Sequence, residues 1–157
     1  METLMKRALD IAHLFDVPRG EMACEPYGTG NINDTFCLTV RPWTGAARRY
    51  ILQRVNRYVF PDPEPMMGNI QRVTHYLRGV IAREGGNPAR ETLTLVRAMD
   101  GRPWITDASG DLWRVYLFIE GTVSTDMPAS VSWGDLTRRR CILRCLIFII
   151  RRRACSS

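Results

Sequence analysis

The chain has 157 residues, 45% of them hydrophobic and 24% charged, which is typical of a folded domain and excludes a disordered chain. Its net charge of +6 is confined to residues 133–157, which contain seven arginines and one acidic residue, Asp135. Residues 1–132 are neutral, and no segment offers the roughly 20 apolar residues of a membrane span, so neither a nucleic-acid-binding domain nor a membrane-spanning protein is expected.

The five cysteines do not form a metal-binding pattern, because none of them has a second pair of cysteines or histidines at ligand spacing. Cys24 and Cys37 fall on two neighbouring predicted strands, and we expect buried free thiols rather than a disulfide. Near the N-terminus, Asp10 and His13 interrupt the apolar run and no small-residue cleavage site follows, so an export signal is not indicated. These features predict a cytoplasmic protein.

Hydrophobic periodicity and turn residues divide the chain into predicted helices and strands. The predicted helices are residues 2–15 and 65–83, and the strand-like runs are residues 21–27, 35–40, 48–55, 92–98, 103–106 and 112–119. Asp100-Gly101 and Ser109-Gly110 are strong hairpin turns between the last three runs. Strands grouped without β-α-β alternation predict an α+β fold, with an antiparallel sheet of about five strands, a packed helix and an N-terminal helix.

The glycine-rich turn at residues 27–36, YGTGNINDTF, lies between the first two predicted strands. Gly28 and Gly30 can adopt positive φ angles, so the backbone between them can fold over a ligand and direct N–H groups at phosphate oxygens. A turn that only closes a hairpin explains the same residues. The segment is therefore a candidate phosphate-binding loop that requires support from elsewhere in the chain.

The third predicted strand carries a candidate cation for such a ligand. Arg54 shares a face with Tyr50 and Leu52, whereas Gln53 belongs to the opposite face. A cation one strand beyond the glycine turn could contact the phosphates of a nucleotide. The equal alternative is that Arg54 is an ordinary strand residue exposed to solvent. Glu64 lies at the start of the second helix, where it either interacts favourably with the helix dipole or pairs with the strand cation.

Four blocks of sequence together resemble a known family. They are GTGNINDTF, YILQRVNRYVFPDPEPMMGNIQRVTHYLR, LTLV and GDLWRVYLFIEGT, within a stretch from about residue 7 to about residue 126. In this order they resemble the N-lobe of the protein-kinase-like fold and, more closely, the N-acetylhexosamine 1-kinase-like branch of the aminoglycoside phosphotransferase superfamily. The resemblance implies a kinase that uses ATP and Mg²⁺ to phosphorylate the anomeric hydroxyl of an N-acetylhexosamine.

The resemblance assigns the ATP site to residues from four segments. These are Gly28, Thr29, Gly30 and Asn33 over the phosphates, Gln53 or Arg54 on the third strand, Glu64 as the helix carboxylate, and Phe118, Ile119 and Glu120 as the hinge beside adenine. Two positions depart from protein kinases, because Asn33 replaces the third loop glycine and Gln53 aligns with the strand lysine. Arg54 is then the nearest cation, and the choice between Gln53 and Arg54 stays open.

Residues 133–157 differ from the rest of the chain in composition. In the protein-kinase-like fold the Mg²⁺ ligands and the carboxylate that orients the acceptor hydroxyl come from the C-lobe. The sequence has no His-x-Asp followed by Asn and no later Asp-containing metal motif. We therefore expect residues 1–132 to form a nucleotide-binding N-lobe, residues 133–157 to be out of frame or disordered, and the chain to be inactive alone. The alternatives are a non-catalytic binding module derived from such a lobe, or a basic tail that lies on an anionic membrane surface.

Overall fold

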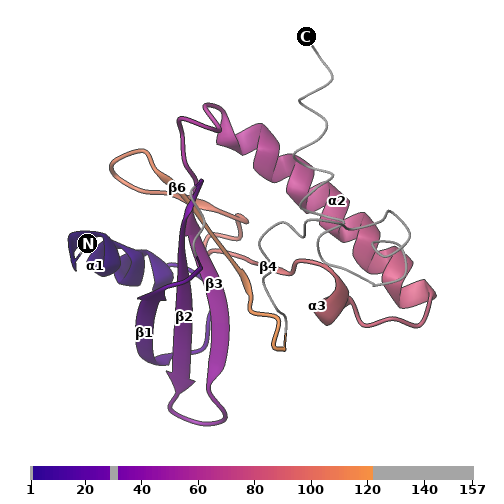
Figure 1. The fold of residues 1–157 in the computed structure, drawn as a ribbon. Helices are drawn as coiled ribbons and strands as arrows, with labels where there is room; N and C mark the ends of the chain where they lie inside the picture. The colour runs from indigo at the N-terminus through magenta and orange to yellow at the C-terminus, as the bar shows by residue number, and fades with distance from the viewer. Residues whose placement is uncertain (1, 29–31, 122–157) are drawn as a thin grey trace, which may run out of the picture. The chain divides into compact units, whose positions relative to one another are not determined.

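The structure, a computed structural model, describes residues 2–28 and 32–121 (Figure 1). Along the chain the helices and strands are α1 (Glu2–Ala12), β1 (Gly20–Pro26), β2 (Asp34–Pro42), β3 (Arg48–Arg54), α2 (Pro63–Arg83), α3 (Pro88–Glu91), β4 (Leu95–Val96), β5 (Ile105–Thr106) and β6 (Leu112–Leu117). The predicted α+β class is confirmed, with six strands in the sheet instead of about five. Contacts divide the described chain into a first unit, residues up to 71 with 95–118, and a second unit, residues 72–94 with those from 119 on.

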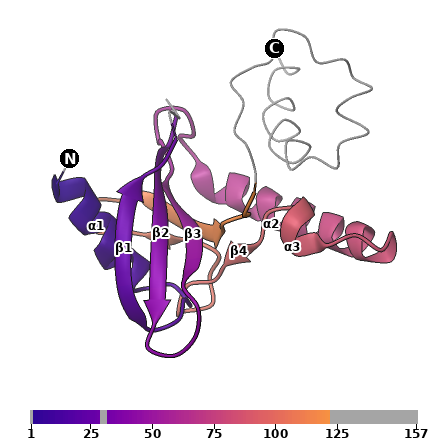
Figure 2. The same cartoon turned by 60° about the horizontal axis from the view of Figure 1, so that its bottom comes forward.

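The sheet of the first unit is antiparallel throughout, in the order β1-β2-β3-β6-β4, with β5 also paired to β6. Figure 2 shows β1, β2 and β3 side by side. Its register places Leu38 of β2 between Cys24 of β1 and Tyr50 of β3. Leu52 of β3 lies opposite Val115 of β6. Because paired residues project to the same side of a sheet, these apolar side chains share one face.

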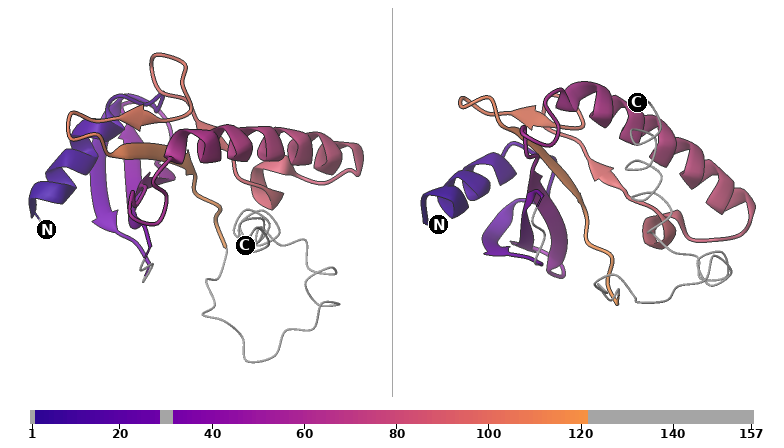
Figure 3. Two further views of the ribbon diagram at one scale, coloured as in Figure 1. Left: turned by 90° about the horizontal axis from the view of Figure 1, so that it is seen from above. Right: turned by 45° about the horizontal axis from the view of Figure 1, so that its top comes forward.

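Helix α1 covers that apolar face. Ala8, Ile11 and Ala12 recur at helical spacing and are buried in one cluster with Leu38 and Leu52 of the sheet. The two views of Figure 3 also show α1 beside β1. Full burial of a large apolar side chain contributes about 1.5–3 kcal/mol, so this layer stabilises the first unit.

The first helix is shorter than predicted. The helix ends at Ala12 rather than at residue 15. Phe15 instead forms an isolated antiparallel bridge with Ala98, and its side chain is buried in the core with 1% of its surface exposed. A long-range pairing therefore replaces the last predicted helical turn.

Cys24 and Cys37 lie on opposite faces of the β1–β2 hairpin. Cys24 is paired with Leu38 on the buried face, whereas Cys37 is paired with Glu25 and is half-buried on the other face. Neither cysteine forms a disulfide in the structure. Burial raises the pKa of the Cys24 thiol to about 11.

A short helix, α3, was not predicted from the glycine-rich break at residues 85–88. Asn87 caps it, since the Asn87 side chain accepts a hydrogen bond from the N–H of Ala89 at 3.1 Å. Glu91 in turn accepts from the N–H of Asn87 at 2.8 Å, and Pro88 occupies the first helical turn, as is common at helix starts. An Asn-Pro pair followed by a glutamate is the sequence signal that marks this helix.

The remaining boundaries differ by a few residues from those expected. Helix α2 begins at Pro63 rather than at Pro65. The predicted strand 92–98 is reduced to Leu95–Val96, and the predicted strand 103–106 to Ile105–Thr106. No helix within residues 2–28 or 32–121 has the length and apolarity needed to cross a membrane.

Candidate functional site

The glycine turn joins β1 to β2, as predicted. The N–H of Tyr27 donates to the carbonyl of Thr35 at 2.9 Å, which closes the hairpin just before the turn. Gly28 has a φ of +76°, and a Cβ at this position would meet no atom within 4 Å. The positive φ expected for Gly28 is therefore present, whereas Thr29 and Gly30 lie outside the described residues.

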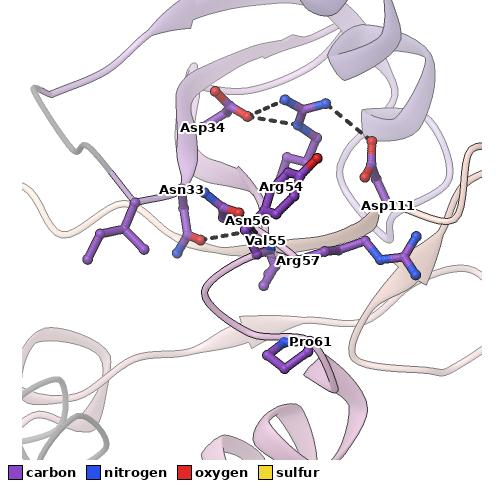
Figure 4. A pocket seen from close by; sticks show the side chains of 10 residues that line it. Asn33, Asp34, Arg54, Val55, Asn56, Arg57, Pro61 and Asp111 are labelled. Carbon is purple, nitrogen blue, oxygen red and sulfur yellow. Dashed lines mark hydrogen bonds and ion pairs between the residues drawn. The ribbon is translucent and has the colours of Figure 1, made fainter.

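Asn33 connects the end of the turn to the segment that follows β3. Its side-chain Oδ1 accepts a hydrogen bond from the backbone N–H of Asn56 at 3.0 Å (Figure 4). The amide of Asn33 is thus engaged in holding two loops together. This contact gives Asn33 a structural role in addition to the phosphate-loop role that the resemblance implies.

Gln53 and Arg54 project to opposite faces of β3, as the strand period predicts. Arg54 lies on the face covered by α1, at the end of the strand. Its guanidinium forms ion pairs with Asp34 at 2.6 Å and with Asp111 at 3.2 Å (Figure 4). Two carboxylates therefore neutralise the cation that the sequence offered as a phosphate ligand.

The ion pairs of Arg54 belong to a larger charged cluster. Arg7 of α1 forms ion pairs with both Asp107 and Asp111. Asp107 also accepts a hydrogen bond from the indole Nε1 of the buried Trp113 at 2.8 Å. Burial raises the pKa of Asp107, but the hydrogen bonds from Trp113 and Arg7 outweigh it and hold that pKa below its ordinary value.

A hollow of about 690 Å³ opens beside this cluster, between the turn and the segment after β3 (Figure 4). Its polar lining consists of Asn33, Asp34, Arg54, Asn56, Arg57, Tyr58 and Asp111. Asn33, Asp34, Arg54 and Asp111 are engaged with one another or with the backbone of Asn56. The hollow therefore presents mostly satisfied groups to a ligand.

The opposite face of the sheet presents Gln53 and, beside it on β6, Arg114. The register pairs these two residues directly. Arg114 donates from Nη2 and Nε to the Oε1 of Gln53 at 2.8 and 3.1 Å, and from Nη1 to the Sδ of Met67 on α2 at 3.6 Å. The Nε2 of Gln53 donates in turn to the Oγ1 of Thr35 at 3.0 Å. Three strands are thus joined by one line of polar contacts.

Arg114 is a buried charge, with only 7% of the residue exposed. Burial lowers the pKa of its guanidinium below the ordinary value for arginine. Sequence reasoning missed this residue, although an arginine inside the apolar run LWRVYLFI is itself a signal. Buried arginines are rare unless they have a partner or a ligand.

Glu64 lies in the first turn of α2 and is exposed. Within the described parts of the chain its carboxylate forms no ion pair with Arg54 or Arg114. A negative charge at this place is favourable to the helix dipole. The dipole alternative raised from the sequence fits the position of Glu64 better than the pairing with a strand cation.

Phe118 follows β6 and lies against the residue that opens the glycine turn. Its ring meets the ring of Tyr27 edge-on, with centroids 5.5 Å apart, and the guanidinium of Arg49 lies 4.1 Å from its centroid. The N–H of Phe118 donates to the carbonyl of Arg49 at 3.2 Å. The first unit therefore brings a predicted hinge residue next to the predicted phosphate loop.

The other two predicted hinge residues belong to the second unit. The backbone carbonyl of Glu120 accepts a hydrogen bond from Nη2 of Arg90 at 3.0 Å. Ile119 is half-buried and Glu120 is exposed. Their expected contact with adenine stays a prediction.

No model of a known protein family matches this chain. Within residues 2–28 and 32–121 no group of three or more His, Cys, Asp or Glu side chains is placed to hold a metal ion. The kinase resemblance and the expected Mg²⁺ therefore rest on the sequence blocks and enter below as a proposal.

Proposed function

We propose that the first unit is the ATP-binding lobe of a small-molecule kinase similar to the aminoglycoside phosphotransferases, of the N-acetylhexosamine 1-kinase-like kind. One observation carries the proposal. Tyr27 at the glycine turn and Phe118 after β6 meet edge-on, and Gln53, in line with the kinase strand lysine, belongs to the face of β3 opposite α1. In the protein-kinase-like fold the nucleotide contacts the corresponding three segments.

The residues on this face have distinct chemical tasks in the proposal. Tyr27 and Phe118 provide aromatic surface for the adenine ring, since aromatic pairs favour offset and edge-on contacts. The positive φ of Gly28 lets the turn direct backbone N–H groups toward phosphate oxygens without a Cβ in the way. Gln53 is held between Thr35 and Arg114, so its amide orientation is fixed.

Phosphoryl transfer requires Mg²⁺ and a carboxylate that orients the acceptor hydroxyl, and the resemblance assigns both to a second lobe. We therefore propose that this chain binds ATP without phosphorylating a sugar. An assay of ADP release in the presence of N-acetylhexosamines is expected to give no sugar-dependent signal. Turnover by the purified chain would contradict this part of the proposal.

Binding of ATP is tested on the full chain by thermal unfolding and calorimetric titration. A ligand that binds the folded state alone raises the unfolding temperature as its concentration rises. We expect ATP to do so, and we expect Phe118→Ala to weaken the effect because it removes half of the aromatic contact.

The matched control is Trp43→Ala, which removes an aromatic side chain that is 80% exposed in the loop between β2 and β3. This variant should respond to ATP like the wild type. If millimolar ATP leaves the wild type unchanged in both measurements, the proposal is wrong, and the non-catalytic binding module becomes the better account.

A further inference from the structure

Arg114 differs from the ion-paired arginines of the first unit in having only neutral partners. Arg7, Arg54 and Arg102 each bind one or two carboxylates. Arg114 instead binds the Oε1 of Gln53 and the Sδ of Met67, and no carboxylate within the described chain reaches it. Burial of a guanidinium without an opposite charge is costly, so a retained one points to an anion from elsewhere.

Some of the N–H donors of Arg114 also lack a hydrogen-bond partner. A guanidinium has five N–H groups. Three are used, two on Gln53 and one on Met67, so the remaining N–H groups have no partner among residues 2–28 and 32–121. These free donors belong to the terminal nitrogens, the part of arginine that binds two oxygens of one phosphate at once.

The neighbours of Arg114 hold its guanidinium in place. Gln53 accepts two of its N–H groups and is itself fixed by Thr35, so the plane of the guanidinium is set from β3. Thr35 of β2 and Tyr116 of β6, on the same face of the sheet, are half-buried. The site is therefore pre-arranged, which lowers the entropic cost of ligand binding.

We propose that Arg114 forms an oxyanion site on this face of the sheet, and that its ligand is a phosphate group of a nucleoside triphosphate. The identity of the nucleotide rests on the proposed function, whereas the anion site rests on Arg114 itself. Gln53, which replaces the strand lysine, is in this account a positioning residue for a cation that comes from β6. Arg54 is excluded because Asp34 and Asp111 already neutralise it.

The test measures affinities of the full chain for three probes: ATP, tripolyphosphate and adenosine. Arg114→Met removes the charge and keeps an unbranched, flexible side chain suited to the buried position. We expect it to weaken ATP and tripolyphosphate by roughly 10- to 100-fold and to leave adenosine unchanged, since charge-assisted hydrogen bonds are lost. Arg19→Met removes an equal charge from an exposed position and should change none of the three affinities.

Gln53→Glu provides a second variant that keeps Arg114 in place. It sets a carboxylate against the guanidinium where Oε1 now accepts, at 2.8 Å. An internal ion pair would then replace the external anion, so we expect tripolyphosphate affinity to fall while the unfolding temperature holds or rises. This variant keeps the proposal testable if Arg114→Met does not fold.

The outcomes separate the anion site from the nucleotide function. If ATP and tripolyphosphate both bind and both weaken in Arg114→Met and in Gln53→Glu, both proposals are supported. If tripolyphosphate binds through Arg114 but adenosine does not bind and ATP gains nothing over it, the anion site stands and the nucleotide function falls. Unchanged affinities in the two variants, loss in Arg54→Met instead, or no binding of tripolyphosphate to the wild type would overturn the inference.

Discussion

At the scale of single residues, Asp107 connects several parts of the first unit through hydrogen bonds that no sequence motif predicted. One carboxylate oxygen accepts from Arg7 and from the indole of Trp113, and the other accepts from the N–H groups of Ser109 and Asp111 at 2.9 and 3.0 Å. The residue thereby ties α1 to the β5–β6 turn and to the core tryptophan.

Asp107→Ala is expected to lower the free energy of unfolding by at least about 2 kcal/mol, because the buried Trp113 N–H then lacks an acceptor. The measurement is urea unfolding followed by tryptophan fluorescence. Asp100→Ala is the control, since Asp100 also accepts within a turn but pairs with Arg102 at an exposed site, and its midpoint should barely move. Equal losses in both variants would contradict the assignment.

The lowered pKa of Asp107 predicts a pH dependence of stability. Its ordinary value is 3.8, and the folded value lies below it. The unfolded state therefore binds a proton more readily, so the contribution of this carboxylate is complete above pH 3.8 and is lost as pH falls through the folded pKa. We expect the stability difference between wild type and Asp107→Asn, measured by urea unfolding, to shrink below pH 3.8. A difference that is constant from pH 6 to pH 3 would refute this linkage.

At the scale of helices and strands, Gly20 is required by the packing of the β1–β2 hairpin. A Cβ at Gly20 would lie 2.0 Å from the backbone carbonyl oxygen of Arg41, a contact that the strand pair cannot relieve without moving. Gly20→Ala should therefore destabilise the fold by roughly 1–3 kcal/mol.

The matched substitution is Gly79→Ala in α2, where a Cβ meets nothing within 4 Å. Alanine is the better helix former, so this variant should gain about 0.5–1 kcal/mol. Thermal and urea unfolding of the two variants give the comparison. The hairpin register would be in error if both substitutions shifted stability in the same direction.

Strands in which apolar and polar residues alternate were predictable from sequence. Strands whose extent depends on pairing with distant segments were not. Phe36, Leu38 and Val40 are buried at every second position of β2, and this pattern is local. In the run 92–98 only Leu95–Val96 pair with β6, and the backbone of residues 97 and 98 pairs instead with Asp16 and Phe15. No local sequence pattern predicts that the segment after α1 pairs with residues 97 and 98.

The candidate site also combines features that were predictable from local sequence with features that depend on distant pairing. Strand periodicity correctly placed Gln53 and Arg54 on opposite faces of β3. The ion pair of Arg54 with Asp34 depends on the register between β2 and β3. The ion pair of Arg54 with Asp111 and the position of Arg114 beside Gln53 depend on the register between β3 and β6. Sequence alone offers no such register, so Arg114 was absent from the predicted site.

At the scale of the whole first unit, the sheet offers two different surfaces. One face is filled by α1 and ends in a charged cluster, of which Asp34, Arg54 and Asp111 line the hollow of Figure 4. The other face carries the buried guanidinium of Arg114 together with the aromatic pair of Tyr27 and Phe118. The central claim is that a nucleotide binds the second surface rather than the hollow.

Hydrogen exchange of the full chain with and without ATP tests this claim most directly, because it reports which backbone amides the ligand protects. The account predicts slower exchange with ATP in peptides that cover residues 23–28, 35–37 and 113–118. Unchanged exchange throughout, or protection limited to residues 55–61 at the hollow, would contradict it.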